Sequence, residues 1–215
     1  MKFSLIICTY LRPEVIVKLL YSVAIQTLCP NEILIVDGST DNKTKDILEK
    51  YNFNNLIYYK VSSKDRGLTK QRNFGIKKMS IESEVVCFLD DDIILEKDYF
   101  EQLLKTYTIF PEALGVGGYI IDETKSEFVG DNYQPKIGDY FFDGWKRKDG
   151  SRFILRKKFG LDSDCPPGYS TLYSHGRSIG FLPPSGKTYP VEMLMGGVSS
   201  FRKKVFNTLQ YYTYF

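Results

Sequence analysis

The stretch "VVCFLDDDIILEKDYF", residues 85–100, decides the fold that we expect for this chain. Residues 85–89 form a continuous apolar run, which is typical of a strand buried on both faces of a sheet. The next three residues are Asp90, Asp91 and Asp92. Two unit charges about 4 Å apart repel by roughly 4 kcal/mol at an effective dielectric near 20. Three carboxylates at the end of a buried strand therefore need a partner that offsets this repulsion.

Short apolar runs alternate with helical patterns along the first half of the chain. In "EVIVKLLYSVAIQT" (14–27), for example, apolar residues recur at a spacing of three or four. Strands that alternate with helices predict an α/β fold, with a mostly parallel central sheet and helices on both faces. We expect strands at 3–8, 32–36, 56–61, 85–89 and 113–121, and helices at 14–27, 40–51, 67–79 and 97–107.

The alternation stops in the second half of the chain. Residues 122–190 combine glycines, prolines and polar residues with little helical periodicity, so we expect the least ordered part of the chain there. The pair Asp149-Gly150 lies between aromatic or apolar runs and predicts the turn of a β-hairpin within 140–160. Order returns within 189–206, as a short strand, the pair Gly196-Gly197 and the start of a helix.

Residues 145–160, within the predicted hairpin, are unusually basic. One acid, Asp149, faces seven cations there. Two interpretations stay open: a solvated hairpin, or contact with an anionic acceptor such as a lipid-linked pyrophosphate or with a membrane surface. The cations are Lys146, Arg147, Lys148, Arg152, Arg156, Lys157 and Lys158.

Polar residues follow the ends of three predicted strands. Thr9-Tyr10 ends the first strand, Asp37-Gly38-Ser39 the second and Asp90-Asp91-Asp92 the fourth. In an open parallel sheet these ends share one edge, and ligands bind in the crevice outside it. Oxygen ligands at such an edge suit a hard cation such as Mg²⁺ or Mn²⁺, which typically binds through one or two carboxylates plus substrate phosphates. Such a cation would offset the repulsion between the aspartates.

Each of these features also has a purely structural interpretation. The three aspartates could cap the helix that follows and favour its dipole. Asp37-Gly38 and Gly196-Gly197 could each be a tight turn, and Arg72 could lie on a solvated helix face. The joint pattern is more informative than any single member, because three separate stretches converge on one edge of the sheet.

Taken together, these motifs resemble those of the family-2 glycosyltransferases, whose fold is the Rossmann-like GT-A fold. The resemblance covers residues 3 to about 100 well and 190–206 less closely, whereas 122–190 match only in length and position. It implies one glycosyltransferase domain over 1–215, with a nucleotide-sugar-binding half at 1–121 and an incomplete acceptor-side half at 122–215 that carries the flexible basic hairpin. The matching stretches are "IICTYLRPEVIVKLLYSVAIQT", "EILIVDGSTDNKT", "GLTKQRNFGI", "FLDDDIIL" and "MLMGGVSSFRKKVF".

The resemblance also implies which residues bind the donor, a nucleotide-diphosphate sugar. Thr9 and Tyr10 would line the base pocket, and Asp37 would bind the base or ribose with Ser39 nearby. Arg72 and Asn73 would help to hold the nucleotide. The residues expected at the nucleotide are Thr9, Tyr10, Asp37, Ser39, Arg72, Asn73, Asp90 and Asp91.

A metal site and a sugar site are implied in the same way. Asp90 and Asp92 would form a DxD pair, with Asp90 toward the ribose and Asp92 on a Mn²⁺ or Mg²⁺ ion that Asp90 also helps to hold. Gly196 and Gly197 would line the region of the donor sugar and the acceptor. The acceptor would be a saccharide or a lipid-linked molecule, in the synthesis of cell-surface polysaccharide or glycolipid.

The reaction implied is sugar transfer with inversion at the anomeric carbon. The metal stabilises the departing nucleoside diphosphate, and a carboxylate base deprotonates the acceptor hydroxyl. In the family this base follows the segment that resembles "GGVSSFRKKVF", but here no Asp or Glu follows Glu192. We therefore expect the base beyond Phe215. The alternative is a fragment that binds the nucleotide sugar but lacks the base and is catalytically impaired.

Two other classes of enzyme fit the sequence poorly. A phosphatase of the haloacid-dehalogenase type needs its aspartates after the first strand, where this chain has Thr9-Tyr10. A dinucleotide-binding protein needs a G-x-G-x-x-G motif that opens a helix, and "GVGGY" lacks that spacing.

Composition sets the remaining bounds. The net charge of +3 is too small to indicate a nucleic-acid partner, so we expect none. No run approaches the roughly 18 apolar residues of a membrane span, and the N-terminus does not resemble a signal peptide. The four cysteines show no metal-ligand spacing, which favours reduced thiols. We expect a cytoplasmic protein, with a peripheral position at the inner face of the membrane as a variant of that location.

Overall fold

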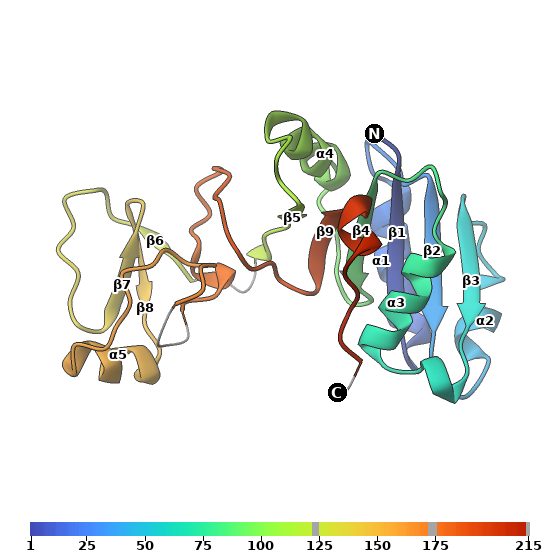
Figure 1. The fold of residues 1–215 in the computed structure, drawn as a ribbon, viewed down its shortest axis with the longest axis horizontal. Helices are drawn as coiled ribbons and strands as arrows, with labels where there is room; N and C mark the ends of the chain where they lie inside the picture. The colour runs from blue at the N-terminus through green and yellow to red at the C-terminus, as the bar shows by residue number, and fades with distance from the viewer. Residues whose placement is uncertain (122–124, 172–175, 214–215) are drawn as a thin grey trace. The chain divides into compact units, whose positions relative to one another are not determined.

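The apolar run before the three aspartates forms β4 (Val85–Asp90), a strand in the interior of a six-stranded sheet (Figure 1). The computed structural model describes residues 1–121, 125–171 and 176–213. The chain forms two compact units. The first consists of Met1–Gly118 with Gly196–Phe215, and the second is Tyr119–Met195. That the two units belong to one domain over residues 1–215 stays a prediction.

The sheet of the first unit has the strand order β3-β2-β1-β4-β9-β5. Four neighbouring strands run parallel, whereas β9 is antiparallel to both of its neighbours. The sheet is therefore mostly parallel, as the alternating pattern predicts. The other strands are β1 (Phe3–Thr9), β2 (Glu32–Asp37), β3 (Leu56–Lys60), β5 (Gly115–Gly117) and β9 (Val198–Arg202).

Two predicted strands differ from the structure. The strand expected over 113–121 is limited to β5, because only three of its residues pair with β9. The short strand expected within 189–206 lies after the pair Gly196-Gly197 rather than before it. It forms β9, and a 3-10 helix, Lys203–Asn207, takes the place of the expected helix start.

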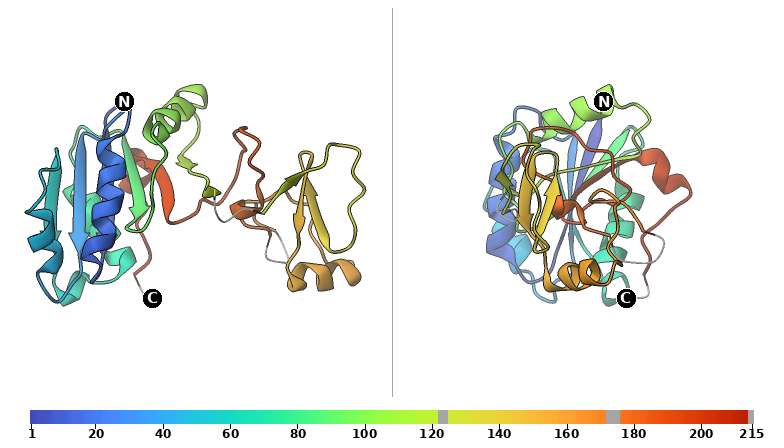
Figure 2. Two further views of the ribbon diagram at one scale, coloured as in Figure 1. Left: turned by 180° about the vertical axis from the view of Figure 1, so that it is seen from behind. Right: turned by 90° about the vertical axis from the view of Figure 1, so that its left-hand side faces the viewer.

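Helices cover both faces of this sheet, with α1 (Pro13–Ala24) on one face and α3 (Leu68–Lys78) on the other (Figures 1 and 2). Gly75 lowers the helix propensity of α3, yet it allows a close approach to the sheet. A Cβ atom at this position would lie 2.7 Å from Cγ2 of Ile6. The remaining helical elements of this unit before residue 118 are α2 (Lys43–Leu48), α4 (Tyr99–Ile109) and a 3-10 turn at Ser63–Asp65.

The core under α3 is built from alternate residues of the sheet. Burying one Val, Leu, Ile or Phe side chain contributes about 1.5–3 kcal/mol. The cluster therefore fixes the strands as a rigid support for the polar residues at their ends. Its buried members are Ile6, Leu34, Val36, Val61, Val86 and Phe88.

The second unit contains a three-stranded sheet of order β6-β8-β7 and one α-helix. The hairpin turn is Asp143-Gly144, so the turn predicted at Asp149-Gly150 is wrong. Asp143 and Gly144 have φ of 50° and 77°. Two-residue hairpin turns of the commonest type need a positive φ at both of their central residues. Gly150 instead precedes a helix, with φ −70°. The elements are β6 (Glu127–Phe128), β7 (Asp139–Phe142), β8 (Trp145–Lys148), α5 (Ser151–Lys158) and a 3-10 turn at Ile179–Phe181.

A buried arginine lies in the interior of the second unit. Arg177 donates from Nε and Nη2 to the two carboxylate oxygens of Asp149, at 3.2 and 2.9 Å, and from Nη2 to Asp162 at 2.7 Å. Its guanidinium carbon lies 4.2 Å from the ring centroid of Tyr140 and 4.5 Å from that of Phe153. Arg177 and Asp149 are thus both buried and paired with each other.

Within residues 1–121, 125–171 and 176–213, no helix is both long and apolar enough to cross a membrane.

Candidate functional site

A pocket of about 420 Å³ opens at the carboxyl ends of β1 and β4, the edge at which the sequence predicts a site. Five predicted site residues line it: Thr9, Tyr10, Asp90, Asp91 and Asp92. The structure brings these five residues together, although β1 and β4 are about 80 residues apart in the chain. Their binding of a nucleotide stays a prediction. The other residues of its lining are Cys8, Arg12, Arg66, Gly67, Leu68 and Gln71.

Arginines offset the repulsion between the three aspartates. Arg12 donates from Nη1 to Asp91 Oδ1 at 2.7 Å and from Nη2 to Asp92 Oδ2 at 3.0 Å. Arg72 donates from Nη2 to Asp90 Oδ1 at 3.1 Å. Each aspartate at the end of β4 therefore has a cationic partner within the chain.

The three aspartates differ in their access to solvent. The side chain of Asp91 is 6 % exposed, against 45 % for Asp90 and 51 % for Asp92. Burial raises the pKa of Asp91, while the hydrogen bond from Thr9 Oγ1, at 2.7 Å, and the charge of Arg12 lower it. Asp91 thus ties β4 to β1, and Asp90 and Asp92 present carboxylate oxygens to the pocket.

Asp37 lies behind the pocket and is fully buried. It accepts hydrogen bonds from the backbone N–H of Ser39 and from the hydroxyl of Tyr58, both at 2.7 Å. Ser39, also buried, accepts one from the backbone N–H of Leu11 at 2.8 Å, and Leu11 has a left-handed φ of 55°. Asp37 and Ser39 therefore hold the strained turn between β1 and α1. Their predicted contact with the nucleotide stays a prediction.

Arg72 and Asn73 lie on the buried side of α3 rather than in the pocket lining. Arg72 is flanked by the rings of Phe88 and Tyr211, with its guanidinium carbon 5.5 and 5.4 Å from their centroids. The Asn73 side chain donates to the carbonyl of Tyr211 at 2.8 Å and accepts from its N–H at 2.9 Å. The two residues thus fasten the segment around Tyr211 to α3.

The glycine pair packs beneath the same aspartates. The carbonyl of Gly196 accepts a hydrogen bond from Arg72 Nη2 at 2.8 Å, and that of Gly197 accepts one from the N–H of Asp90 at 3.0 Å. A Cβ atom on Gly197 would lie 2.7 Å from Asp90 Oδ2. Gly197 therefore leaves room for the Asp90 carboxylate, and its predicted role toward a sugar stays a prediction.

Three pocket residues escaped the sequence analysis. Gln71 donates from Nε2 to the carbonyls of Thr9 and Val36, at 3.1 and 2.7 Å, and so joins the ends of β1 and β2. Arg66 lies 5.8 Å from the ring centroid of Tyr10, and Arg12 holds the aspartates. A signal existed for Arg12, because it follows the first strand and so falls at the same sheet edge as three carboxylates.

The described residues offer few side chains that could bind a metal ion. Among the residues that the structure describes, no group of three or more His, Cys, Asp or Glu side chains is arranged to hold a metal ion. The pocket offers two exposed carboxylates, those of Asp90 and Asp92. A cation at this edge would therefore need further ligands from a bound substrate or from water.

Parts of this chain are similar in sequence to known proteins. The sequence model described as "Glycosyl transferase family 2" matches residues 4–175. Glucosyl-dolichyl phosphate glucuronosyltransferase of Haloferax volcanii is 28 % identical over 143 residues, which cover 64 % of this chain and 45 % of that protein. Glycosyltransferase GlyA of Streptococcus pneumoniae serotype 4 is 32 % identical over 144 residues, covering 64 % of this chain and 20 % of that protein.

Solved structures add one comparison. The crystal structure of S. aureus TarS shares 31 % sequence identity, with a TM-score of 0.47, over 63 % of this chain and 23 % of that chain. This chain thus matches less than half the length of each of these proteins. The family model, by contrast, spans well over half of this chain, and the observed sheet agrees with the predicted GT-A class. The chain belongs to glycosyltransferase family 2.

Proposed function

We propose that the pocket binds a nucleotide-diphosphate sugar and that the protein transfers the sugar to an acceptor hydroxyl. One observation carries the proposal: a single pocket gathers an exposed aromatic ring, two exposed carboxylates and two arginines. These groups match the parts of such a donor, which are a flat base, a ribose and a diphosphate. Membership in the family supports the same reaction class.

The base would lie against Tyr10, whose ring is exposed at the pocket and has the Arg66 guanidinium on one side. Arg66 and Arg12 would then donate to the diphosphate, because guanidinium groups recognise phosphate oxygens through paired N–H donors. Asp90 would accept hydrogen bonds from the ribose hydroxyls. Asp37 and Ser39 would act from behind by holding the turn that carries Tyr10 and Arg12.

The exposed carboxylates fit a divalent cation shared with the diphosphate. Asp92 and Asp90 would hold Mn²⁺ or Mg²⁺, which typically binds proteins through one or two carboxylates and completes its shell with phosphate and water. When bound, the cation supplies Lewis-acid stabilisation of the departing nucleoside diphosphate. Arg12 occupies Asp92 Oδ2 in the free chain, so Arg12 would move from the carboxylate to the phosphates as the donor enters.

Transfer with inversion also needs a base for the acceptor hydroxyl. A positioned base typically contributes about 10²- to 10⁴-fold in rate. Glu192, the last acidic residue of the sequence, lies in the second unit and accepts a hydrogen bond from the N–H of Ser170 at 2.8 Å. Residues 193–215 contain no Asp or Glu, so we propose that a carboxylate elsewhere in the protein serves as the base. We also propose that the acceptor is a saccharide or a lipid-linked molecule. One relative, named for glucosyl-dolichyl phosphate, supports the lipid-linked class.

Calorimetry with nucleoside diphosphates tests the donor site. We expect one of UDP, GDP, dTDP and CDP to bind more tightly with Mn²⁺ than without it. Asp92→Asn should remove this Mn²⁺-dependent gain while leaving the melting temperature close to that of the parent chain. The matched control is Asp46→Asn, an exposed acid of α2 outside the pocket lining. Equal, Mn²⁺-dependent affinity in the Asp92→Asn variant would show that Asp92 holds no metal.

A further inference from the structure

We propose that the outward face of α5 binds the surface of a membrane that carries anionic lipid head groups. This inference goes beyond the proposed transfer reaction and concerns the second unit alone. It rests on an exposed apolar pair on a helix, on the cations beside that pair, and on the absence of acids from the helix.

The apolar pair is Leu155 and Phe159, which lie four residues apart and hence on the same side of the helix. Leu155 is 57 % exposed and Phe159 is 70 % exposed. Leu161 follows just after the helix and is exposed as well. One aromatic and two aliphatic side chains of one short segment are therefore exposed to solvent.

The opposite side of α5 is fixed to the second unit. Phe153 is buried there and has the ring of Phe181 at a centroid distance of 5.6 Å. Lys157 donates to the carbonyl of Asp139 at 2.6 Å and pairs with Asp149 at 2.5 Å. The exposed face is thus preformed, so a partner would not have to order the helix before binding it.

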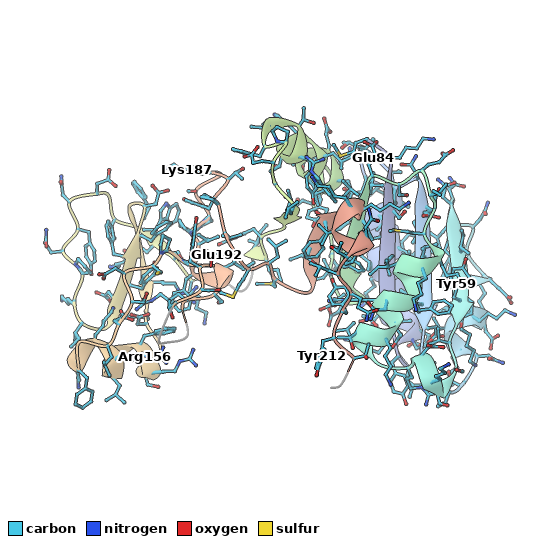
Figure 3. All side chains as sticks on the ribbon, in the orientation of Figure 1. Tyr59, Glu84, Arg156, Lys187, Glu192 and Tyr212 are labelled. Carbon is cyan, nitrogen blue, oxygen red and sulfur yellow. The ribbon has the colours of Figure 1, made fainter. Side chains whose placement is uncertain are left out.

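Cations flank the apolar pair. Arg152 and Lys158 are exposed, and Arg156 projects from the side of α5 in Figure 3. The helix Ser151–Lys158 contains no acidic residue. Among the residues the structure describes, no ion pair involves Arg152 or Lys158. The face therefore carries net positive charge around an apolar centre.

The remaining cations of this region have partners inside the unit. Lys146 pairs with Glu127 at 3.1 Å and Lys148 with Asp139 at 2.6 Å. Arg147 donates to the carbonyl of Gly180. The basic segment in the sequence therefore divides into two groups. The cations of β8 and Lys157 of α5 have partners within the unit, whereas Arg152 and Lys158 of α5 are exposed and form no ion pair among the described residues.

This pattern is complementary to an anionic lipid surface. A helix with apolar residues on the outward side and Lys or Arg beside them lies in the interface, with its apolar side chains at the boundary of head groups and acyl chains. Each Lys or Arg near an anionic surface strengthens binding by about fivefold. A helix as short as α5 would bind reversibly. The cations around the apolar centre favour such a surface over an uncharged protein groove.

Vesicle co-sedimentation tests the proposal with the full chain and no donor. The probes are vesicles of phosphatidylcholine alone and vesicles of equal parts phosphatidylcholine and phosphatidylglycerol. We expect binding to the anionic vesicles, weakened by raised sodium chloride, and little binding to phosphatidylcholine. Arg152→Gln/Lys158→Gln should lower the binding by about 25-fold. Leu155→Ser/Phe159→Ser should lower it at least about tenfold, since these side chains would enter the interface.

Matched controls keep the same chemical changes away from α5. Lys18→Gln/Lys50→Gln removes two exposed cations of the first unit, and Ile81→Ser/Ile109→Ser removes two of its exposed apolar side chains. Both controls should bind like the parent chain, and circular dichroism should show every variant folded. Failure to bind anionic vesicles, or an equal loss in the control variants, would overturn the proposal. A dimer in solution that Leu155→Ser/Phe159→Ser dissociates would also overturn it, in favour of a second copy as the occupant.

Discussion

Two arginines in this chain each bridge a pair of carboxylates, but they do so in opposite surroundings. Arg177 holds Asp149 and Asp162 in the interior of the second unit. Arg12 holds Asp91 and Asp92 at the mouth of the pocket in the first unit, and its own side chain is about half exposed. The chemistry of the two pairs is the same, so the difference lies in their access to water.

Access to water decides what such a pair can do. In the interior, removal of one partner leaves an uncompensated charge and is strongly destabilising. At the surface, water replaces a lost partner, so an exposed ion pair contributes little to stability. Arg177 is therefore a fixed element of the fold. Arg12 is free to exchange its carboxylates for other anions, as the proposed donor site with a bound metal would require.

The largest expected effect belongs to Arg177. Arg177→Ala should lower the free energy of unfolding of the second unit by up to about 3–5 kcal/mol, because it removes a buried cation that pairs with both Asp149 and Asp162. Lys157 then remains as the cation paired with Asp149. Urea unfolding followed by hydrogen exchange in residues 119–195 measures this loss.

The matched control is Lys187→Ala, which breaks the exposed pair with Asp143 in the same unit. It should leave the unfolding midpoint close to that of the parent chain. If the two variants lose equal stability, burial is not what separates the two kinds of pair.

A smaller effect is expected for Tyr58→Phe, which tests a buried carboxylate, Asp37, that forms no ion pair among the residues that the structure describes. The change removes one of two donors to Asp37, whose carboxylate is fully buried. We expect a loss of about 1–2 kcal/mol in the free energy of unfolding, because the acceptor oxygen is left without a partner. Tyr59→Phe, one residue along β3, is the control. An unchanged midpoint for Tyr58→Phe would mean that water reaches Asp37.

Arg12→Ala should change stability by only a small fraction of the Arg177→Ala effect. It should, however, tighten the binding of Mn²⁺ alone, because the Asp92 carboxylate no longer has a competing cation. Electron paramagnetic resonance of free Mn²⁺ measures this affinity. Weaker Mn²⁺ binding in the variant would contradict an exchangeable pair at the pocket.

The smallest effect concerns a pair with one exposed partner. The hydrogen bonds from Lys148 and then Tyr133 lower the pKa of Asp139 well below its ordinary 3.8. As the pH falls, the Asp139 carboxylate takes up its proton at a higher pH in the unfolded chain than in the folded one. The pair therefore stabilises the folded unit fully above pH 3.8, and this stabilisation is lost as the pH falls through the lowered pKa. Lys148→Met should weaken this acid sensitivity in unfolding curves measured at falling pH. Identical curves for parent and variant would rule out the contribution.

Much of the first unit follows from local sequence. Strands buried on both faces leave continuous apolar runs, such as residues 85–89, and these runs can be recognised without tertiary information. Parallel strands bring their carboxyl ends to one edge, so the position of Thr9, Tyr10 and the three aspartates also follows from the order of the elements. The family resemblance implies the same strands and the same edge of the sheet.

The second unit shows why the rest could not be predicted. Asp143-Gly144 and Asp149-Gly150 have the same local sequence, yet only the first closes a hairpin. The choice depends on the pairing of β7 with β8 and on the helix that follows, not on the turn residues. The partners of Arg177 are 15 and 28 residues away, so no local pattern reveals them.

The pairing of β5 with β9 has a consequence for how this protein can change. The N–H of Gly118 donates to the carbonyl of Val198 at 2.8 Å, so the chain leaves the sheet and returns to it at adjacent positions. Each doubling of a loop closed in this way costs only about 0.6 kcal/mol of entropy. The segment between these points can be lengthened, shortened or exchanged while both of its ends stay joined by the hydrogen bond between Gly118 and Val198. Evolution can therefore rework residues 119–195 without rebuilding the edge that carries the aspartates.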